Sequence, residues 1–195
     1  MLNHLFLTPK QVTFMRKILL CAFSFFVLFA SNLKAQESFG QGTFALNLGV
    51  GISAWSWAYN GAGFSPAWSL SGDYGIKEDL GPGTLGVGGL IGFHSAGYKD
   101  DDYKYRWTNI TFGPQVTYHP YFAQTEKLDA YVALGLLARM YSYNTNIDGI
   151  DGISNFFIRA SFRVGARYYF TEKIGVFGEV GYGASYFTAG LAIKF

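Results

Sequence analysis

The stretch from residue 156 to residue 170 constrains the fold of this chain most strongly. Apolar residues alternate along it with charged or small ones: one face carries Ile158, Ala160, Phe162, Val164, Ala166 and Tyr168, and the other carries Arg159, Ser161, Arg163, Gly165 and Arg167. A period of two residues is typical of a β-strand whose two faces meet different surroundings. The pattern therefore predicts a strand with one apolar and one charged face.

Seven other stretches repeat the alternation, at residues 43–53, 64–76, 84–96, 104–119, 128–143, 174–186 and 187–195. Opposite their apolar side chains stand mostly small residues, whereas a soluble sheet would present lysine, glutamate and threonine to water. Small residues suit the crowded interior of a narrow barrel whose outer face meets lipid. We therefore expect an all-β fold, an eight-stranded antiparallel up-and-down transmembrane β-barrel. A soluble β-sandwich or a lipocalin-like barrel is the alternative.

An apolar run at residues 18–30 precedes the first of these stretches. The basic residues Arg16 and Lys17 come directly before it, and a short segment ending at Ala35 follows, which is the layout of a secretory signal peptide. The run is shorter than the roughly 20 residues that a transmembrane helix needs. The predicted domains are a signal peptide at residues 1–35 and an outer-membrane β-barrel at residues 36–195.

Cleavage at this point changes the charge and the cysteine content. It would remove four of the 15 basic residues, which leaves 11 against 13 acidic residues. Because no basic cluster remains, we expect no nucleic-acid partner. Cys21 is the only cysteine and lies in the signal peptide, so the mature chain would hold no disulfide. Met15 is an alternative initiation site, and an uncleaved membrane anchor is the alternative to a signal peptide.

The signal peptide, the eight amphipathic stretches and the ending Leu191-Ala-Ile-Lys-Phe195 resemble one family. It comprises the small eight-stranded outer-membrane barrels of Gram-negative bacteria, of the OmpA transmembrane-domain and OmpX type, grouped with porin-family proteins. The resemblance implies a location in the cell outer membrane, surrounded by lipid and lipopolysaccharide. It also implies that the barrel assembly machinery reads the last strand, at Ala189, Leu191, Ile193 and Phe195. The Gln36-Glu37 start is similar to that of Bacteroidota proteins.

The side chains that face the lumen by alternation include many charges. They are Asp73, Asp129, Arg139, Arg159, Arg163, Arg167, Glu179 and Lys194, together with the polar Asn47, His94, Gln115 and His119. An unpaired buried charge costs several kcal/mol, and eight strands leave an interior that side chains can fill. We therefore expect an ion-paired network that plugs the lumen. The alternative is a small-solute or anion channel lined by Arg159, Arg163 and Arg167.

Aromatic residues near the strand ends predict two girdles at the headgroup levels. The outer one would include Tyr105, Trp107, Tyr141, Tyr143 and Phe156, and the inner one Tyr74, Tyr168, Phe170 and Phe195. The longer connections, at residues 54–63, 97–103 and 144–155, are expected outside the cell. Pro114 cannot donate a ladder hydrogen bond and predicts a bulge in its strand.

The function predicted from these features is a structural or surface-interaction role, without catalysis, cofactor or metal. A surface partner could bind through the extracellular loops. An outer-membrane enzyme acting on lipid A is a weaker alternative, because the neighbours His94 and Ser95 point to opposite faces of their strand. The acidic stretches at residues 100–102 and 148–151 do not match an ordered calcium loop and are expected to be solvated.

Overall fold

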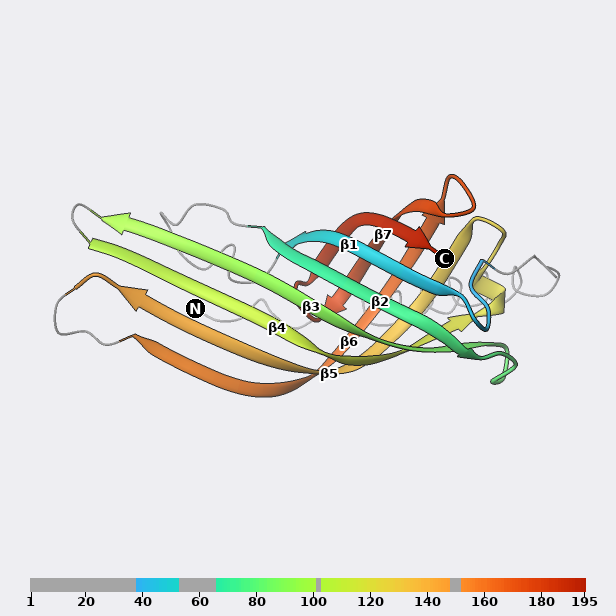
Figure 1. Cartoon of the computed structure of the whole chain (residues 1–195), viewed down its shortest axis with the longest axis horizontal. Coiled ribbons are helices and arrows are strands. Elements are labelled where there is room, and N and C mark those ends of the chain that lie inside the picture. The colour runs from blue at the N-terminus through green and yellow to red at the C-terminus, as the bar shows by residue number, and fades with distance from the viewer. Residues whose placement is uncertain (1–37, 53–65, 101–102, 148–151) are drawn as a thin grey trace, which may run out of the picture. The chain divides into compact units, whose positions relative to one another are not determined.

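The computed structural model describes residues 38–52, 66–100, 103–147 and 152–195. These residues form one closed barrel in which every strand pairs antiparallel with its neighbour in the chain, and the last strand pairs with the first (Figure 1). The strands are β1 (Phe44–Ile52), β2 (Ala67–Lys77), β3 (Gly83–Asp100), β4 (Tyr103–Pro120), β5 (Leu128–Thr145), β6 (Ile153–Tyr169), β7 (Ile174–Tyr182) and β8 (Phe187–Lys194). The predicted all-β, eight-stranded up-and-down barrel is confirmed.

The seam between β1 and β8 closes the barrel along the whole length of both strands. Their register runs from Ala45 opposite Lys194 to Ile52 opposite Phe187. The backbone N–H of Phe195 donates to the carbonyl of Phe44 at 2.8 Å. In lipid every backbone polar group needs an internal partner, so this closure removes the free edge that an open sheet would expose.

The outward face of the wall is apolar and exposed. Leu134 and Ile158, for example, expose 57% and 64% of their surface to the exterior. A continuous surface of this kind favours contact with lipid over contact with water. No helix in the described ranges is long and apolar enough to cross a membrane.

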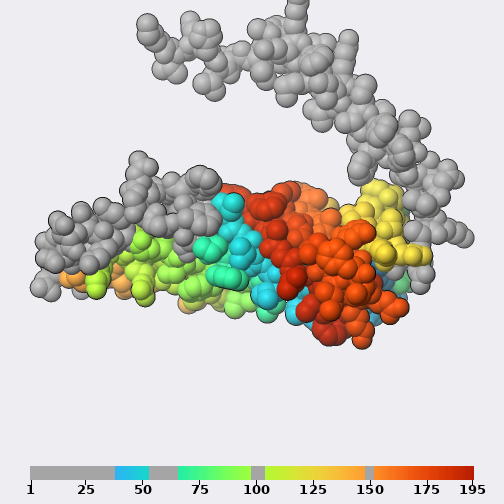
Figure 2. Space-filling model, turned by 90° about the horizontal axis from the view of Figure 1, so that it is seen from above, coloured from blue at the N-terminus to red at the C-terminus, as the bar shows by residue number. Residues whose placement is uncertain are grey.

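The four strands β3 to β6 are much longer than the others. They contain 17 or 18 residues, whereas β1 and β7 contain nine. A tilted strand of about 9 to 11 residues spans the membrane. Figure 1 shows the four long strands running on past the others at one end, and Figure 2 shows the same extension in the space-filling view. We call this the outer end of the barrel.

The outward side chains of the long strands mark where the lipid contact stops. One row across these strands is apolar, and the next row toward the outer end carries only hydroxyl groups. The apolar row is Phe93, Ile110, Met140 and Phe156, and the hydroxyl row is Ser95, Thr108, Ser142 and Ser154. The wall beyond the hydroxyl row therefore projects above the membrane.

This projection corrects the predicted outer connections. β3 continues through Asp100 and β4 begins at Tyr103, so most of the connection expected at residues 97–103 is strand. β5 likewise continues through Thr145 into the connection expected at 144–155. The connection expected at 54–63 lies outside the described residues, as does the predicted boundary between residues 35 and 36.

The bulge predicted at Pro114 is also wrong. The register of β4 with β5 is the same before and after this residue, with Phe112 opposite Ala138 and Gln115 opposite Gly135. A register shift occurs instead between Gly75 and Lys77, where β2 meets β3 at the inner end. The missing N–H of Pro114 is accommodated within the regular register.

Candidate functional site

A short segment before β1 closes the inner end of the lumen. Gly42 has a φ of +86°, a conformation that glycine adopts readily, and its N–H donates to the carbonyl of Gly75. The chain that precedes this turn puts Phe39 into the barrel, where its side chain is fully buried. The ring of Phe39 stacks on that of His119, with centroids 3.8 Å apart. Its backbone N–H donates to the Oε1 atom of Gln124 at 3.1 Å.

Arg167 of β6 is the centre of the polar cluster above Phe39. Its guanidinium is fully buried and donates to Asp73 and, at 2.7 Å, to Oδ2 of Asp129. Its Nε donates to Oδ1 of Asn47 at 2.9 Å, and its charge lies 4.3 Å from the ring centroid of Tyr131. One cation from β6 therefore connects β1, β2 and β5 across the lumen.

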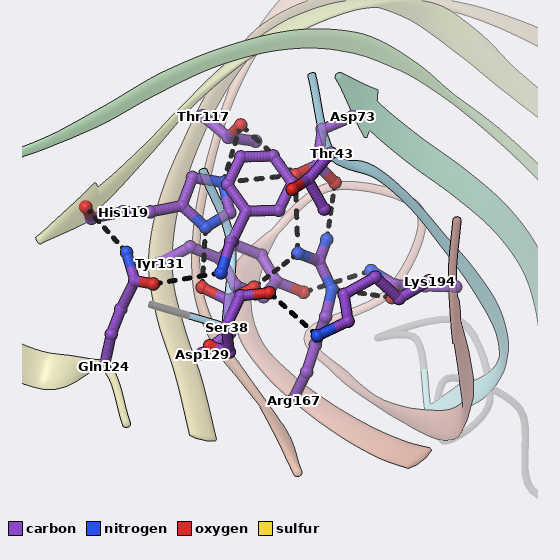
Figure 3. Close-up of polar contacts among 12 residues, drawn as sticks. Ser38, Thr43, Asp73, Thr117, His119, Gln124, Asp129, Tyr131, Arg167 and Lys194 are labelled. Atoms are coloured by element: carbon purple, nitrogen blue, oxygen red, sulfur yellow. Dashed lines mark hydrogen bonds and ion pairs between the residues drawn. The ribbon is translucent and has the colours of Figure 1, made fainter. Parts of the chain in front are cut away.

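His119 of β4 lies between the same two carboxylates. Its Nδ1 is 2.7 Å from Oδ1 of Asp129, and its Nε2 is 3.1 Å from Oδ2 of Asp73. Figure 3 shows His119 and Arg167 with both aspartates between them. Each carboxylate is thus shared by an imidazole and a guanidinium, which is the pairing that buried charges require.

A second ion pair joins this cluster on the side toward the outer end. Nη1 of Arg163 is 3.2 Å from Oε2 of Glu179, and its Nη2 donates to the side chain of Gln115. The hydroxyl of Tyr131 donates to Oε1 of Glu179 at 2.7 Å and accepts a hydrogen bond from Asn47. The connected set, which we call the central network, consists of Asn47, Asp73, Gln115, Thr117, His119, Asp129, Tyr131, Arg163, Arg167 and Glu179.

The central network fills the middle of the lumen. None of its residues exposes more than 5% of its surface, and they come from six of the eight strands. A Cβ atom at Gly165 would lie 2.7 Å from the ring of Tyr131 and 2.8 Å from Cγ of Glu179, so the wall has no room there for a larger residue. Phe39 covers the network from the inner end.

The structure brings together five of the eight lumen charges predicted from the sequence, namely Asp73, Asp129, Arg163, Arg167 and Glu179. Lys194 lies at the inner end, where its Nζ donates to the carbonyl of Ser38 at 3.1 Å and sits 4.7 Å from the ring centroid of Tyr169. Arg139 and Arg159 lie on the outer side of the network and join none of its ion pairs. The expected pairing of all eight charges is therefore not what the described residues show.

Two parts of this arrangement were not predicted. Alternation places His119 in the lumen, but no sequence signal says that it shares both aspartates with Arg167. Phe39 lies before the first alternating stretch and carries no periodic signal at all. The Gly-rich turn between Gly40 and Thr43 is the one local hint that the chain reverses there.

The outer side of the lumen holds a cavity of about 620 Å³. We call it the outer cavity. Its lining includes Arg139, Arg159, His94, Asn109, Tyr141 and Tyr182. Arg139 donates to the carbonyl of Gly183 at 2.9 Å, and Arg159 donates to the hydroxyl of Tyr182 at 2.6 Å. In the described ranges, no carboxylate forms an ion pair with either guanidinium.

Thr117, His119 and Asp129 form an arrangement that resembles a catalytic triad. Oγ1 of Thr117 is 3.0 Å from Nε2 of His119, whose Nδ1 contacts Asp129. All three side chains are fully buried, and Asp73 also faces Nε2, so a substrate has no access to the hydroxyl. No cluster of potential metal ligands occurs in the part of the chain that the structure describes.

The predicted outer girdle is wrong for its members on β4 and β5, whereas Phe156 on β6 is exposed on the outward face. Trp107 shares the inward parity of Asn109 on β4, and its ring lies 5.7 Å from that of Tyr143 and 6.3 Å from that of Tyr105. Tyr141 lines the outer cavity. These aromatic rings belong to the lumen-side face of the projecting wall, and the outward positions at this level carry hydroxyl groups instead.

The predicted inner girdle and the last strand face outward as expected from alternation. Tyr74, Tyr168, Phe170 and Phe195 are exposed, and the rings of Tyr168 and Phe170 lie 5.6 Å apart. The four residues proposed for assembly, Ala189, Leu191, Ile193 and Phe195, occupy alternate positions on the same outward face of the chain end.

Comparison with known proteins identifies the family. The model of the outer membrane protein beta-barrel domain matches residues 21–194. No curated protein matches the chain. Among solved structures, Ail of Yersinia pestis, in complex with the heparin analogue sucrose octasulfate, is 10% identical with a TM-score of 0.52, over 80% of this chain and 99% of that chain. The N-terminal barrel domain of Pseudomonas aeruginosa OprF is 20% identical with a TM-score of 0.46, over 80% and 98%. This chain therefore belongs to the outer membrane protein beta-barrel domain family and is located in the cell outer membrane.

Proposed function

We propose that this protein is a non-conducting outer-membrane barrel with a structural or surface-interaction role and no chemistry of its own. The central network carries the proposal, because it joins six strands across the lumen through buried ion pairs and hydrogen bonds. Phe39 adds an apolar seal on the inner side. A solute would have to break buried ion pairs to pass, and separating such a pair costs about 3–5 kcal/mol.

The channel alternative depended on an arginine path, which the contacts disfavour. Arg163 and Arg167 are engaged by Glu179, Asp73 and Asp129. A permeating anion would compete with these fixed carboxylates at two successive levels. Of the three arginines of that path, only Arg159, in the outer cavity, lacks a carboxylate partner among the described residues.

The enzyme alternative gains no support from the placement of His94 and Ser95. His94 lines the outer cavity and Ser95 faces the other side of β3, so the two side chains do not meet. The triad-like set around His119 is sealed by Phe39. Both observations favour a structural or surface-interaction role over catalysis.

Conductance in planar lipid bilayers tests the closed lumen. We expect no discrete current steps from the wild-type protein, and no change in ion selectivity on Arg163→Ala. Heat-modifiable gel migration verifies that the reconstituted sample is a folded barrel. Regular steps from the wild-type barrel, with a selectivity that Arg163→Ala alters, would establish a channel and overturn the proposal.

We also propose that the last strand directs insertion through the barrel assembly machinery. The support is its outward face, where Leu191 and Phe195 present large apolar groups beside the closing seam. Phe195→Ser should lower the amount of heat-modifiable barrel in outer-membrane fractions. Phe170→Ser, which removes an equally exposed ring on the inner side, is the matched control and should have a smaller effect.

A further inference from the structure

The two ends of the lumen differ in charge balance. In the central network, every carboxylate is engaged by a cationic or hydrogen-bonding side chain. In the outer cavity, Arg139 and Arg159 contact only neutral partners among the described residues, at Gly183, Thr111 and Tyr182. The acids of the network cannot neutralise these two arginines, because their own partners hold them. Among the described residues that line the cavity, the charged groups are therefore cationic.

Hydrogen bonds hold the two guanidinium groups in place and leave some of their N–H donors available to a ligand. Arg139 on β5 donates through Nε and Nη2 to Thr111 and Gly183, and Arg159 on β6 donates through Nη1 to Tyr182. Each guanidinium has five N–H donors in a fixed plane. Such a fork matches the oxygens of carboxylate, phosphate and sulfate groups, and fixing the side chain in advance reduces the entropy that binding would cost.

The remaining walls of the cavity suit a ring rather than a bare ion. Tyr141, Phe157, Tyr182 and Tyr186 supply aromatic surface, and the side chains of Asn109 and Asn155 supply amide groups. Arg159 already lies 4.8 Å from the ring centroid of Phe157. A volume of about 620 Å³ falls in the range of about 300–1,000 Å³ that is common for small-molecule sites, which are mostly apolar with a few placed polar groups.

The cavity is closed below by buried side chains. Leu137, Ser161 and Arg163 expose no more than 3% of their surface, and they separate the cavity from the central network's aspartates. The described residues therefore leave a ligand no route from the cavity toward the inner end. This geometry is that of a binding cup and not of a pore.

We propose that the outer cavity binds a small organic anion, such as an acidic or phosphorylated sugar. Arg139 and Arg159 hold its anionic group, and the aromatic walls contact its ring. The two sources of such an anion are a dissolved solute and a phosphorylated sugar of the surrounding lipopolysaccharide. This inference goes beyond the structural role and does not depend on whether the lumen conducts.

Binding of glucose 6-phosphate tests this site, with glucose as the neutral counterpart of the same ring. The full barrel is reconstituted in phospholipid nanodiscs and titrated by protein-observed NMR, which detects binding even at millimolar concentrations. We expect saturable shifts with glucose 6-phosphate, and none with glucose. Arg139→Gln and Arg159→Gln should each weaken binding about tenfold, since a hydrogen bond to a charged group typically contributes that much.

Arg106→Gln is the matched control, because it removes the same charge from an exposed outward position of β4 that does not line the cavity. It should leave the affinity unchanged. Equal binding of glucose, no saturable shift with glucose 6-phosphate, or equal weakening by Arg106→Gln and Arg159→Gln would each overturn the proposal. Heat-modifiable migration confirms that each variant is folded before it is titrated.

A second titration separates the two sources. Nanodiscs that contain lipopolysaccharide are compared with nanodiscs of phospholipid alone. One outcome is that, in nanodiscs with lipopolysaccharide, the NMR signals of cavity residues are already shifted before titration and glucose 6-phosphate binding is lost. That result supports the site with lipopolysaccharide as its ligand. Unchanged binding in both supports the site with a dissolved anion as its ligand.

Discussion

Replacing Arg167 with methionine should be the most destabilising single charge change in the barrel. The substitution keeps an unbranched chain in the lumen but removes the guanidinium that contacts Asp73, Asp129 and Asn47. Both aspartates then face only His119 and their neutral neighbours. Breaking a buried pair by removing one partner costs about 3–5 kcal/mol. We expect the free energy of unfolding to fall by that amount, because two carboxylates lose their shared cation.

Arg159→Met is the matched control, because Arg159 lies exposed in the outer cavity and has no carboxylate partner among the described residues. Its cost should stay within about 1 kcal/mol. The double variant Arg167→Met/Asp73→Asn should be more stable than the sum of the two single changes predicts, with a coupling of about 0.5–3 kcal/mol, because the residues are in contact.

Urea titration of the barrel in lipid vesicles, followed by tryptophan fluorescence, measures all of these values. The slope of the free energy against urea must stay constant for the comparison to hold. Equal losses for Arg167→Met and Arg159→Met would refute the claim that the network's ion pairs stabilise the barrel. Strict additivity in the double variant would refute the coupling between Arg167 and Asp73.

Three further changes test other parts of the structure. Phe39→Ala should lower the free energy of unfolding by about 3–5 kcal/mol in the same urea assay, and Phe39→Leu by less, because leucine keeps most of the buried volume. If neither substitution changed the free energy of unfolding, the segment would not seal the barrel. Gly165→Ala should destabilise by about 1–3 kcal/mol through its clash with Tyr131, whereas Gly178→Ala, with no atom within 4 Å of its Cβ, should be nearly neutral. Ser142→Cys should react with a membrane-impermeant maleimide on intact cells, and Met140→Cys should not. The reverse result would show that the membrane boundary assigned between these two residues is wrong.

The alternation of the sequence predicted the strands because lipid and lumen impose opposite demands on adjacent residues. It placed the ends less well, since β3 to β6 keep alternating after the lipid stops. There the outward positions become Ser95, Thr108 and their neighbours, while aromatic residues such as Trp107 move to the lumen side. A girdle and a lumen-side cluster have the same composition, so only the parity of each residue separates them.

The partners inside the lumen could not be predicted from the sequence. Alternation identified the inward charges, but every inward position of one strand can reach several others across a narrow barrel. Arg167 pairs with Asp73, 94 positions earlier, and hydrogen-bonds to Asn47, 120 positions earlier. Such choices depend on the stagger of all eight strands. The unbalanced charge of the outer cavity is a consequence of those choices, and it too is visible only in three dimensions.

The central network also bears on how the barrel is completed during folding. It takes residues from β1 and from β7, and Lys194 at the end of β8 contacts Ser38 across 156 positions of the chain. Such distant contacts form late, because the loops that they close are long. A chain that lacks its final strands would hold Arg167 and its aspartates in a sheet open to water or lipid. The buried ion pairs therefore stabilise the barrel only after it has closed. An incomplete barrel gains little stability from them.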